Sequence, residues 1–324
     1  MIRIAIIGYG NLGRGVETAI KKTDDTELVG IFTRRDPLTV KAKAGKVYSM
    51  ADLYDKKNEI DVCILCGGSA TDLPVQTPEL TKIFNTVDSF DTHAKIPEHY
   101  SVIDDTAKKN STVSIISVGW DPGLFSINRA YAESILPDGE TVTFWGKGVS
   151  QGHSDALRRI DGIKDAIQYT IPNNDIIDRL KVGEHLELST RDKHTRECFI
   201  VLEDGADEAA IIEKIVTMPN YFNEYDTTVN VITQEELEKN HKQKMPHGGK
   251  VLRVGQTSKQ NKEIYDFSLA LDSNPEFTSS TLVAYARACA RLAEEKKYGA
   301  YTVLDIAPSY ISPKSGADLR KELL

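Results

Sequence analysis

Hydrophobic and polar positions along the first part of the chain form blocks that predict strands and helices in turn. Ile2 to Ile7 is an apolar run, Arg14 to Lys22 has helical spacing, and Glu27 to Phe32 is a second apolar run. Apolar runs at 61–66, 85–88 and 112–118 then alternate with helical patterns at 72–84 and 97–110. This alternation predicts a doubly wound parallel sheet of the Rossmann type.

The pattern changes beyond Pro137. Longer strands that look antiparallel are expected at 140–146, 195–202, 227–233, 250–255 and 262–271, with helices near 175–182 and 208–218. A helical pattern at 278–295 predicts a helix that packs back on the first domain. We therefore expect an α/β chain with a dinucleotide-binding domain at 1–123, an α+β domain at 124–275, and a C-terminal segment at 276–324 that returns to the first domain.

The turn after the first strand reads Gly8-Tyr9-Gly10-Asn11-Leu12-Gly13. Gly8 permits a tight turn, Gly10 lets a backbone approach a pyrophosphate, and Gly13 allows a helix to pack closely on the strand. The amino end of the following helix would hold the anion. With a strand before it and a helix and strand after it, the motif predicts dinucleotide binding. The alternative is a tight turn that binds nothing.

The end of the second strand indicates which dinucleotide is bound. A site for NAD usually has a carboxylate about 20 residues on from the glycine turn, to accept from the ribose 2′-hydroxyl. Thr33-Arg34-Arg35 stands here instead, and guanidinium groups pair with phosphate oxygens. The sequence therefore predicts NADP. A solvated basic pair on a loop is the alternative, and Asp36 directly follows the pair.

Three further loops follow strands of the predicted sheet, where ligands of such folds bind. Gly67 to Asp72 is a plausible second cofactor loop, although a plain turn would also explain it. Asp91 with His93 follows the next strand, and Asp121 follows the one after, in Gly-Trp-Asp-Pro-Gly. Two carboxylates and a Trp beside a nicotinamide suggest a substrate with a cationic group such as an ammonium.

Polar residues of the second domain gather in a few places. They are a glycine-rich loop at 145–155 followed by two arginines, Thr170 at the end of a short strand, Arg196, a tight loop at 245–249, and 272–275. An arginine with a histidine and a threonine would suit a carboxylate. The sequence does not show that these segments converge, and ordinary turn chemistry is the alternative for each.

Composition excludes several classes of protein. The net charge of −8 argues against a nucleic-acid partner, and no apolar run reaches the ~20 residues of a membrane helix. The chain begins directly with a strand, which predicts a cytoplasmic protein. Cys63 and Cys66 form a C-x-x-C, but residues three apart on a strand face opposite sides, so we expect buried thiols and not a redox pair. The histidines show no metal-site spacing, and HExxH, Walker A and GxSxG motifs are absent.

Five segments of the chain are distinctive: the glycine turn with Arg14, Gly119 to Gly123, Phe144-Trp145-Gly146, Ser150 to Arg159 and Met245 to Gly249. Together they resemble the meso-diaminopimelate dehydrogenases. The likeness runs nearly end to end, and Ser150 to Asp155 is its most specific part. It implies a homodimer of the bacterial lysine and cell-wall pathway that uses NADP. The reaction implied is oxidative deamination of meso-2,6-diaminopimelate at its D-configured carbon, giving ammonia and L-2-amino-6-oxopimelate, which cyclises to tetrahydrodipicolinate.

The resemblance also implies roles for particular residues. Asp91, Asp121 and Trp145 would surround the reacting D-centre, with Asp91 and Asp121 as candidates to accept the amine proton. Gln151, Gly152 and Asp155 would lie beside it; Thr170, Arg196 and His247 would hold the carboxylate of the L-centre; and Asn274 would contact the distal end. Besides Gly8 and Gly10, the cofactor would be contacted by Tyr9, Asn11, Leu12, Thr33, Arg34, Arg35, Ser69, Ala70, Thr71, Asp72, Thr92, His93, Ala94, Pro122, Gly123, Leu124, Phe125 and Ser126.

Three other functions remain open at this point. A broader NADP-dependent D-amino acid dehydrogenase could use the same scaffold, although Arg196, Thr170 and His247 would then lie unpaired beside a monocarboxylate. A reductase acting on a dihydrodipicolinate-like ring has a similar two-domain build. A non-catalytic NADP-sensing protein would bind the cofactor without turnover.

Overall fold

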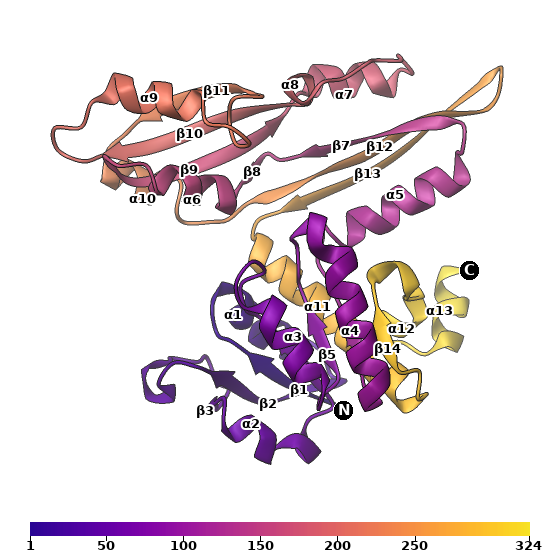
Figure 1. The fold of residues 1–324 in the computed structure, drawn as a ribbon. Helices are drawn as coiled ribbons and strands as arrows, with labels where there is room; N and C mark the ends of the chain where they lie inside the picture. Colours follow the sequence, from indigo (N-terminus) through magenta and orange to yellow (C-terminus); the bar gives the residue numbers. More distant parts are fainter. The chain divides into compact units, whose positions relative to one another are not determined.

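The computed structural model describes all 324 residues and divides the chain into two compact units (Figure 1). Unit 1 comprises Met1–Ile127 with Pro275–Leu324, and unit 2 comprises Asn128–Asn274. The predicted return of the C-terminal segment to the first domain is therefore confirmed. The division falls at 127/128 and 274/275, where the sequence pattern placed it at 123/124 and 275/276.

Unit 1 is built on a seven-stranded sheet in which every neighbouring pair is parallel, as predicted. The central strand β4 and most of β1 are apolar and buried, as parallel strands covered by helices on both faces are. The strand order is β14-β6-β5-β4-β1-β2-β3. Successive strands are added on one side of β1 up to β3 and on its other side from β4 onward, so the strand order reverses between β1 and β4, where ligands bind in such folds. The bounds are β1 Ile2–Ile7, β2 Thr26–Thr33, β3 Val47–Ser49, β4 Val62–Leu65, β5 Thr86–Asp88, β6 Val113–Ile115 and β14 Gly299–Tyr301.

Helices cover both faces of this sheet. One apolar cluster joins Ile4, Ile6 and Ile64 to α1 and α11, and another joins Ala5, Ile7 and Leu65 to α3. The helices of unit 1 are α1 Asn11–Ile20, α2 Asp52–Asp55, α3 Leu73–Thr81, α4 Ile96–Asn110, α12 Pro308–Ile311 and α13 Gly316–Leu323, with α5 Leu124–Ile135 and α11 Asn274–Glu294 at the unit boundaries. Short 3₁₀ turns are η1 Pro37–Thr39, η2 Lys57–Glu59, η3 His93–Lys95 and η4 Val303–Asp305.

The two cysteines of the C-x-x-C belong to different faces of the sheet. Cys63 packs in the cluster with α3, whereas Cys66 packs against the cluster with α1 and α11. All four cysteines are free thiols, and burial raises the pKa of the Cys63 thiol above its usual value. The expectation that the pair diverges, as residues three apart along a strand do, is confirmed.

Two glycines of the first turn are required by geometry. Gly8 has φ +92°, a conformation that side chains with a Cβ rarely adopt. A Cβ on Gly13 would lie 2.3 Å from the carbonyl oxygen of Gly8, so any larger residue would push α1 away from β1. The turn is therefore as close as the glycine spacing predicts.

Unit 2 contains a four-stranded sheet, β11-β10-β9-β8, and a three-stranded antiparallel sheet, β13-β12-β7. The long strands of the second sheet run side by side in Figure 1. Its helices are α6 Gln151–Arg158, α7 Asn174–Lys181, α8 Thr190–Lys193, α9 Glu208–Val216 and α10 Gln234–Asn240. Its strands are β7 Gly139–Trp145, β8 Gly148–Val149, β9 Ile163–Pro172, β10 His194–Leu202, β11 Asp226–Val231, β12 His247–Ser258 and β13 Asn261–Leu271.

Three local predictions for the second domain are wrong. β11 was expected to be antiparallel but runs parallel to β10. The connection through α9 carries the chain back to the end of the sheet at which β10 begins, so both strands run in the same direction. The polar stretch from Gln151 is a helix, α6, because its buried side chains Ala156 and Leu157 pack on the core, which overrides the weak helix propensity of Gly152. The predicted tight loop at 245–249 instead leads into β12, which begins at His247.

Candidate functional site

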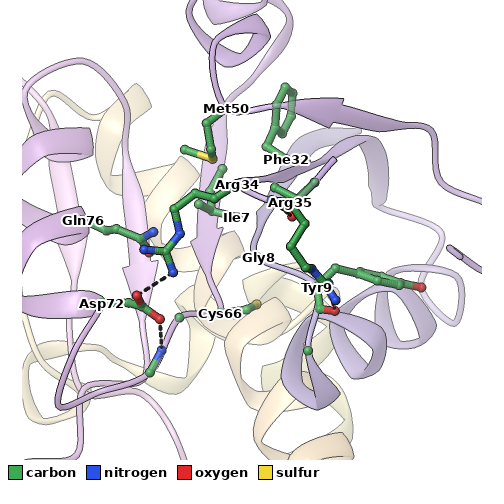
Figure 2. A pocket seen from close by; sticks show the side chains of 14 residues that line it. Ile7, Gly8, Tyr9, Phe32, Arg34, Arg35, Met50, Cys66, Asp72 and Gln76 are labelled. Atoms are coloured by element: carbon green, nitrogen blue, oxygen red, sulfur yellow. Dashed lines mark hydrogen bonds and ion pairs between the residues drawn. The ribbon is translucent and has the colours of Figure 1, made fainter. Parts of the chain in front are cut away.

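A pocket of about 290 Å³ opens beside the carboxyl ends of β1, β2 and β4 in unit 1 (Figure 2). The glycine turn forms one wall, the end of β2 forms the second, and the loop after β4 forms the third. Its walls include Gly8, Tyr9, Gly10, Thr33, Arg34, Arg35, Gly67, Gly68 and Asp72, together with Gln76 and Met50, which the sequence did not single out. Three of the predicted cofactor segments therefore surround one cavity.

A buried carboxylate anchors the glycine turn. The hydroxyl of Tyr9 donates to Glu17 Oε2, and Glu17 also accepts from the backbone N–H groups of Lys43, Ala44 and Gly45, at 3.1, 2.6 and 2.8 Å. Burial alone would raise the pKa of the Glu17 carboxyl, but these hydrogen bonds outweigh it and the pKa lies below its usual value. The Tyr9 phenol is therefore tied into the core, and its backbone remains at the pocket wall.

The two arginines at the end of β2 have different partners. Arg35 donates through Nη2 to the backbone oxygen of Tyr9 at 2.8 Å, which fixes it over the glycine turn. Arg34 forms an ion pair with Asp72 at 2.6 Å, and the other oxygen of Asp72 accepts from Gly68 N at 2.9 Å (Figure 2). The Gly68 amide, with Arg34, holds the pKa of Asp72 below its usual range.

These walls fit a dinucleotide phosphate. Nothing lies within 4 Å of the Cβ position of Gly10, so a ligand can reach the backbone there. The amino end of α1 adjoins this space, and two guanidinium groups line the pocket, that of Arg35 over the glycine turn and that of Arg34 beside Asp72. The expected cofactor is a nicotinamide dinucleotide.

The loops after β4 and β5 are joined at the edge of the sheet. Asp91 N donates to Ser69 Oγ at 2.8 Å, and Ser69 Oγ lies 3.2 Å from Thr92 Oγ1. The Asp91 side chain is exposed to solvent. Ala70 and Thr71 continue the β4 loop, and His93 and Ala94 continue the β5 loop into η3.

Asp121 follows β6 in a loop that turns sharply into α5. Trp120 bridges to Gly123 and packs edge-on against Phe125, with ring centres 5.2 Å apart. Gly123 N donates to Ser126 Oγ at 3.2 Å. Pro122 and Leu124 complete this segment. Asp121 is half-buried, so the loop presents its carboxylate from a fixed backbone.

In unit 2, a buried arginine lies in register with a buried threonine. Arg196 on β10 pairs with Thr170 on β9, and its Nη1 donates to the Thr170 hydroxyl. The guanidinium carbon sits 3.9 Å from the centre of the Tyr225 ring, and Arg196 Nε has no hydrogen-bond partner. No carboxylate pairs with Arg196 within the sheet. A buried cation without its anion is costly, so this arrangement is suited to a ligand carboxylate.

The surroundings of Arg196 keep two histidines neutral. Burial, and then the positive charge of Arg196, lowers the pKa of His153 to about 4 and that of His194 to about 3. Burial also lowers the pKa of Arg196 itself, which the Tyr225 phenol opposes. Arg196 therefore supplies the positive charge of this cluster at neutral pH.

The other predicted substrate residues are spread over unit 2. Trp145 ends β7; its backbone N–H donates to His194 Nε2 at 2.8 Å and its ring stacks on His194. The remaining predicted residues lie on three elements: Gln151, Gly152 and Asp155 on α6, His247 at the start of β12, and Asn274 at the start of α11. Of these, Gln151 Nε2 contacts Met245 Sδ at 3.7 Å, Asp155 pairs with Arg158, and Asn274 N donates to Met245 O at 2.9 Å.

Sequence reasoning missed several side chains around these sites. Tyr225 reaches Arg196 from the turn before β11, 29 residues away in the chain, and no local pattern signals it. Asp88 and Glu17 are fully buried carboxylates whose partners are loop amides. A carboxylate within an apolar run is the one signal that could have identified them.

The chain is similar to known proteins over its full length. Residues 119–273 match the family model of the diaminopimelic acid dehydrogenase C-terminal domain. The meso-diaminopimelate D-dehydrogenase of Ureibacillus thermosphaericus is 60% identical over 100% of this chain and 99% of its own length. The solved C. glutamicum DAP dehydrogenase in complex with DAP is 44% identical with a TM-score of 0.92, covering 100% and 99% of the two chains. An engineered D-amino acid dehydrogenase bound to NADP+ is 42% identical with a TM-score of 0.87, covering 100% and 99%.

The neutral histidines predict a pH dependence of stability. His153 has a pKa of about 4 in the folded protein and about 6.5 when unfolded, so below pH 6.5 the unfolded chain binds the extra proton. Stability should fall as the pH drops from about 6.5 toward 4, by about 1.4 kcal/mol per pH unit for this group. We expect His153→Phe to reduce this slope in urea unfolding. His185→Phe, at an exposed position, is the control, and equal slopes in all three proteins would contradict the prediction.

Proposed function

This chain belongs to the family of meso-diaminopimelate D-dehydrogenases, and we propose that it oxidatively deaminates meso-2,6-diaminopimelate at its D-centre with NADP. It is an oxidoreductase that acts on a CH–NH₂ group and uses a nicotinamide cofactor. The products are ammonia and L-2-amino-6-oxopimelate, which cyclises to tetrahydrodipicolinate. The observation that carries this proposal is Arg196, a buried guanidinium that lacks a carboxylate partner in its own sheet.

The L-centre is the end of the substrate that does not react. We assign its carboxylate to Arg196 and Thr170, with His247, and the contact at the distal end to Asn274. Arg196 offers the free Nε and the remaining guanidinium N–H groups, which match a carboxylate in a planar fork. The contacts to the L-centre determine which α-carbon of the substrate reaches the nicotinamide. Their binding energy therefore orients the substrate as well as raising its affinity.

The D-centre carries an ammonium that must lose one proton, so that the nitrogen lone pair is free, before hydride can leave the carbon. Asp91 and Asp121 are the assigned acceptors, directly or through water, because both are carboxylates on the loops at the ligand edge of the sheet. Trp145, Gln151, Gly152 and Asp155 are assigned to the same end. Hydride leaves the D-carbon as the C–N bond becomes an imine, and water then replaces nitrogen to release ammonia. When bound, the nicotinamide ring would supply the acceptor for this hydride.

NADP is assigned over NAD because of the end of β2. Arg34 and Arg35 stand where an NAD site usually has a carboxylate. Arg34 is two-thirds exposed and held only by Asp72, a surface ion pair of small net energy, so it can turn to a 2′-phosphate at little cost.

Two further assignments rest on the resemblance alone. Unit 2 would serve substrate binding and dimerisation, and the protein would act as a cytoplasmic homodimer. A single monomer mass in solution at micromolar concentration would contradict the dimer. No helix of the chain is long and apolar enough to cross a membrane.

The reaction is tested by nicotinamide reduction with purified protein and NADP. We expect fast reduction with meso-diaminopimelate and little with LL-diaminopimelate or D-alanine, because only the meso isomer has a D-carbon and a distal L-carboxylate. Equal rates with D-alanine would favour a broader D-amino acid dehydrogenase. No reduction with any of them, despite measured binding of NADP, would overturn the proposed function.

The basic pair is tested by Arg34→Ala with Arg35→Ala. Losing charge-assisted hydrogen bonds to a 2′-phosphate should lower the ratio of kcat/KM for NADP to that for NAD by about 100-fold. Lys46→Ala is the control, since this lysine lies over the Tyr48 ring away from the pocket. A ratio unchanged from the wild-type value would show that the pair does not read the phosphate.

The distal site is tested by Arg196→Ala. Loss of the carboxylate fork should raise KM for meso-diaminopimelate at least about 100-fold, leave the Kd for NADP unchanged, and open the site toward simple D-amino acids. Arg191→Ala is the matched control, because Arg191 is exposed and pairs with Asp226 on the same sheet. A substrate profile equal to that of Arg191→Ala would remove Arg196 from carboxylate recognition.

A further inference from the structure

A second buried carboxylate in unit 1 belongs to Asp88, the last residue of β5. Its side chain is completely buried, yet both oxygens are fully used. Oδ1 accepts from the backbone N–H groups of Phe90 and Ser117, at 3.0 and 2.9 Å. Oδ2 accepts from Thr77 Oγ1 at 2.8 Å and lies 2.9 Å from His99 Nε2. Two backbone N–H groups and two side chains therefore contact this one carboxyl group.

The Oδ1 partners belong to the two loops that carry the acidic site residues. Phe90 immediately precedes Asp91, and Ser117 lies four residues before Asp121. The backbone of Asp88 makes a further link, because its carbonyl oxygen accepts from Val118 N at 2.9 Å. The β5 loop and the β6 loop thus share one acceptor, although Asp88 and Ser117 are 29 residues apart.

The Oδ2 partners come from the helices that cover this end of the sheet. Thr77 lies on α3 and His99 lies on α4. The His99 ring also stacks on Phe90, with centres 4.2 Å apart and planes at 18°. Side chains from the two helices therefore fix the carboxylate through Oδ2, and the loop amides that donate to Oδ1 are positioned by it.

The backbone at Ser117 shows how tightly the second loop is set. Ser117 has φ +57°, in the left-handed region that residues other than glycine rarely adopt. Such conformations persist where the surroundings over-determine them. The hydrogen bond from Ser117 N to Asp88 and the one from Val118 N to the Asp88 carbonyl are two such constraints.

We propose that Asp88 is a positioning residue that sets the loops of Asp91 and Asp121 relative to one another. It touches neither substrate nor cofactor, and acts through the backbone amides of Phe90 and Ser117. The inference rests on the proposed function, since it assigns these two loops to the D-centre. Ser69, which binds Asp91 N, links the β4 loop to the same assembly.

The test compares substitutions that keep or remove the Oδ1 acceptor. Asp88→Asn keeps one oxygen for the two loop amides, while its NH₂ can donate to Thr77 and His99. Asp88→Leu has similar size and removes both acceptors. Thr86→Val is the matched control: Thr86 is equally buried on β5 and bonds to Thr81 and Ser114, away from the site loops.

We expect kcat with meso-diaminopimelate to fall at least about 100-fold in Asp88→Leu, because small misplacements of catalytic groups have such effects, and KM to change less than about fivefold. Asp88→Asn and Thr86→Val should stay within about fivefold of the wild type in both. A kcat in Asp88→Leu close to the wild-type value, an equal fall in Thr86→Val, or an equal fall in Asp88→Asn would each overturn the proposal.

Hydrogen exchange gives a readout that needs no turnover. In Asp88→Leu, peptides covering 89–94 and 117–123 should exchange faster together, whereas both should match the wild type in Thr86→Val. Asp88→Ser, whose hydroxyl is too short to reach both amides, replaces Asp88→Leu if the latter does not fold. Unchanged exchange in both segments would overturn the inference even if the enzyme is active, and coupled exchange in a protein inactive on meso-diaminopimelate would uphold it while the proposed function fails.

Discussion

Buried carboxylates that accept backbone N–H groups from loops are the interaction on which unit 1 depends. A parallel sheet places its ligand-facing loops at one edge, and the amides of those loops must be satisfied without regular structure. Glu17 does this for residues 43–45 and also accepts from the Tyr9 hydroxyl of the glycine turn, and Asp88 does it for the β5 and β6 loops. A carboxyl group has two oxygens that can each accept more than one hydrogen bond, so one buried side chain can fix two loops.

In unit 2 the buried charged group is a cation, and its hydrogen bonds are not all satisfied within the protein. Arg196 is a buried cation whose partners are a hydroxyl and an aromatic ring, and one of its N–H groups is left without an acceptor. A ligand carboxylate would offset the cost of burying it, and in the proposed function this favours a substrate with a distal acid. The neutral His153 and His194 add no competing positive charge at pH 7.

Much of unit 1 could be predicted because its central strands are continuous apolar runs and because geometry requires Gly8 and Gly13 in its first turn. The substrate side was harder. The helix α6 was not predicted, because Gly152 and its polar neighbours have weak helix propensity. The direction of β11 depends on the connection through α9, which the pattern of hydrophobic residues does not specify. Tyr225 and Asp88 could not be assigned roles, since their partners are brought to them only by the fold. The site residues implied by resemblance stay predictions.

The central claim is that distal recognition presents the D-carbon, and not the L-carbon, to the nicotinamide. The most direct measurement uses two samples of meso-diaminopimelate, one with deuterium on the D-configured α-carbon and one with deuterium on the L-configured α-carbon. Mass analysis of the reduced cofactor should find deuterium only from the first sample. Deuterium transferred from the second sample, or from both equally, would contradict the assignment of Arg196 to the L-carboxylate and with it this account of the site.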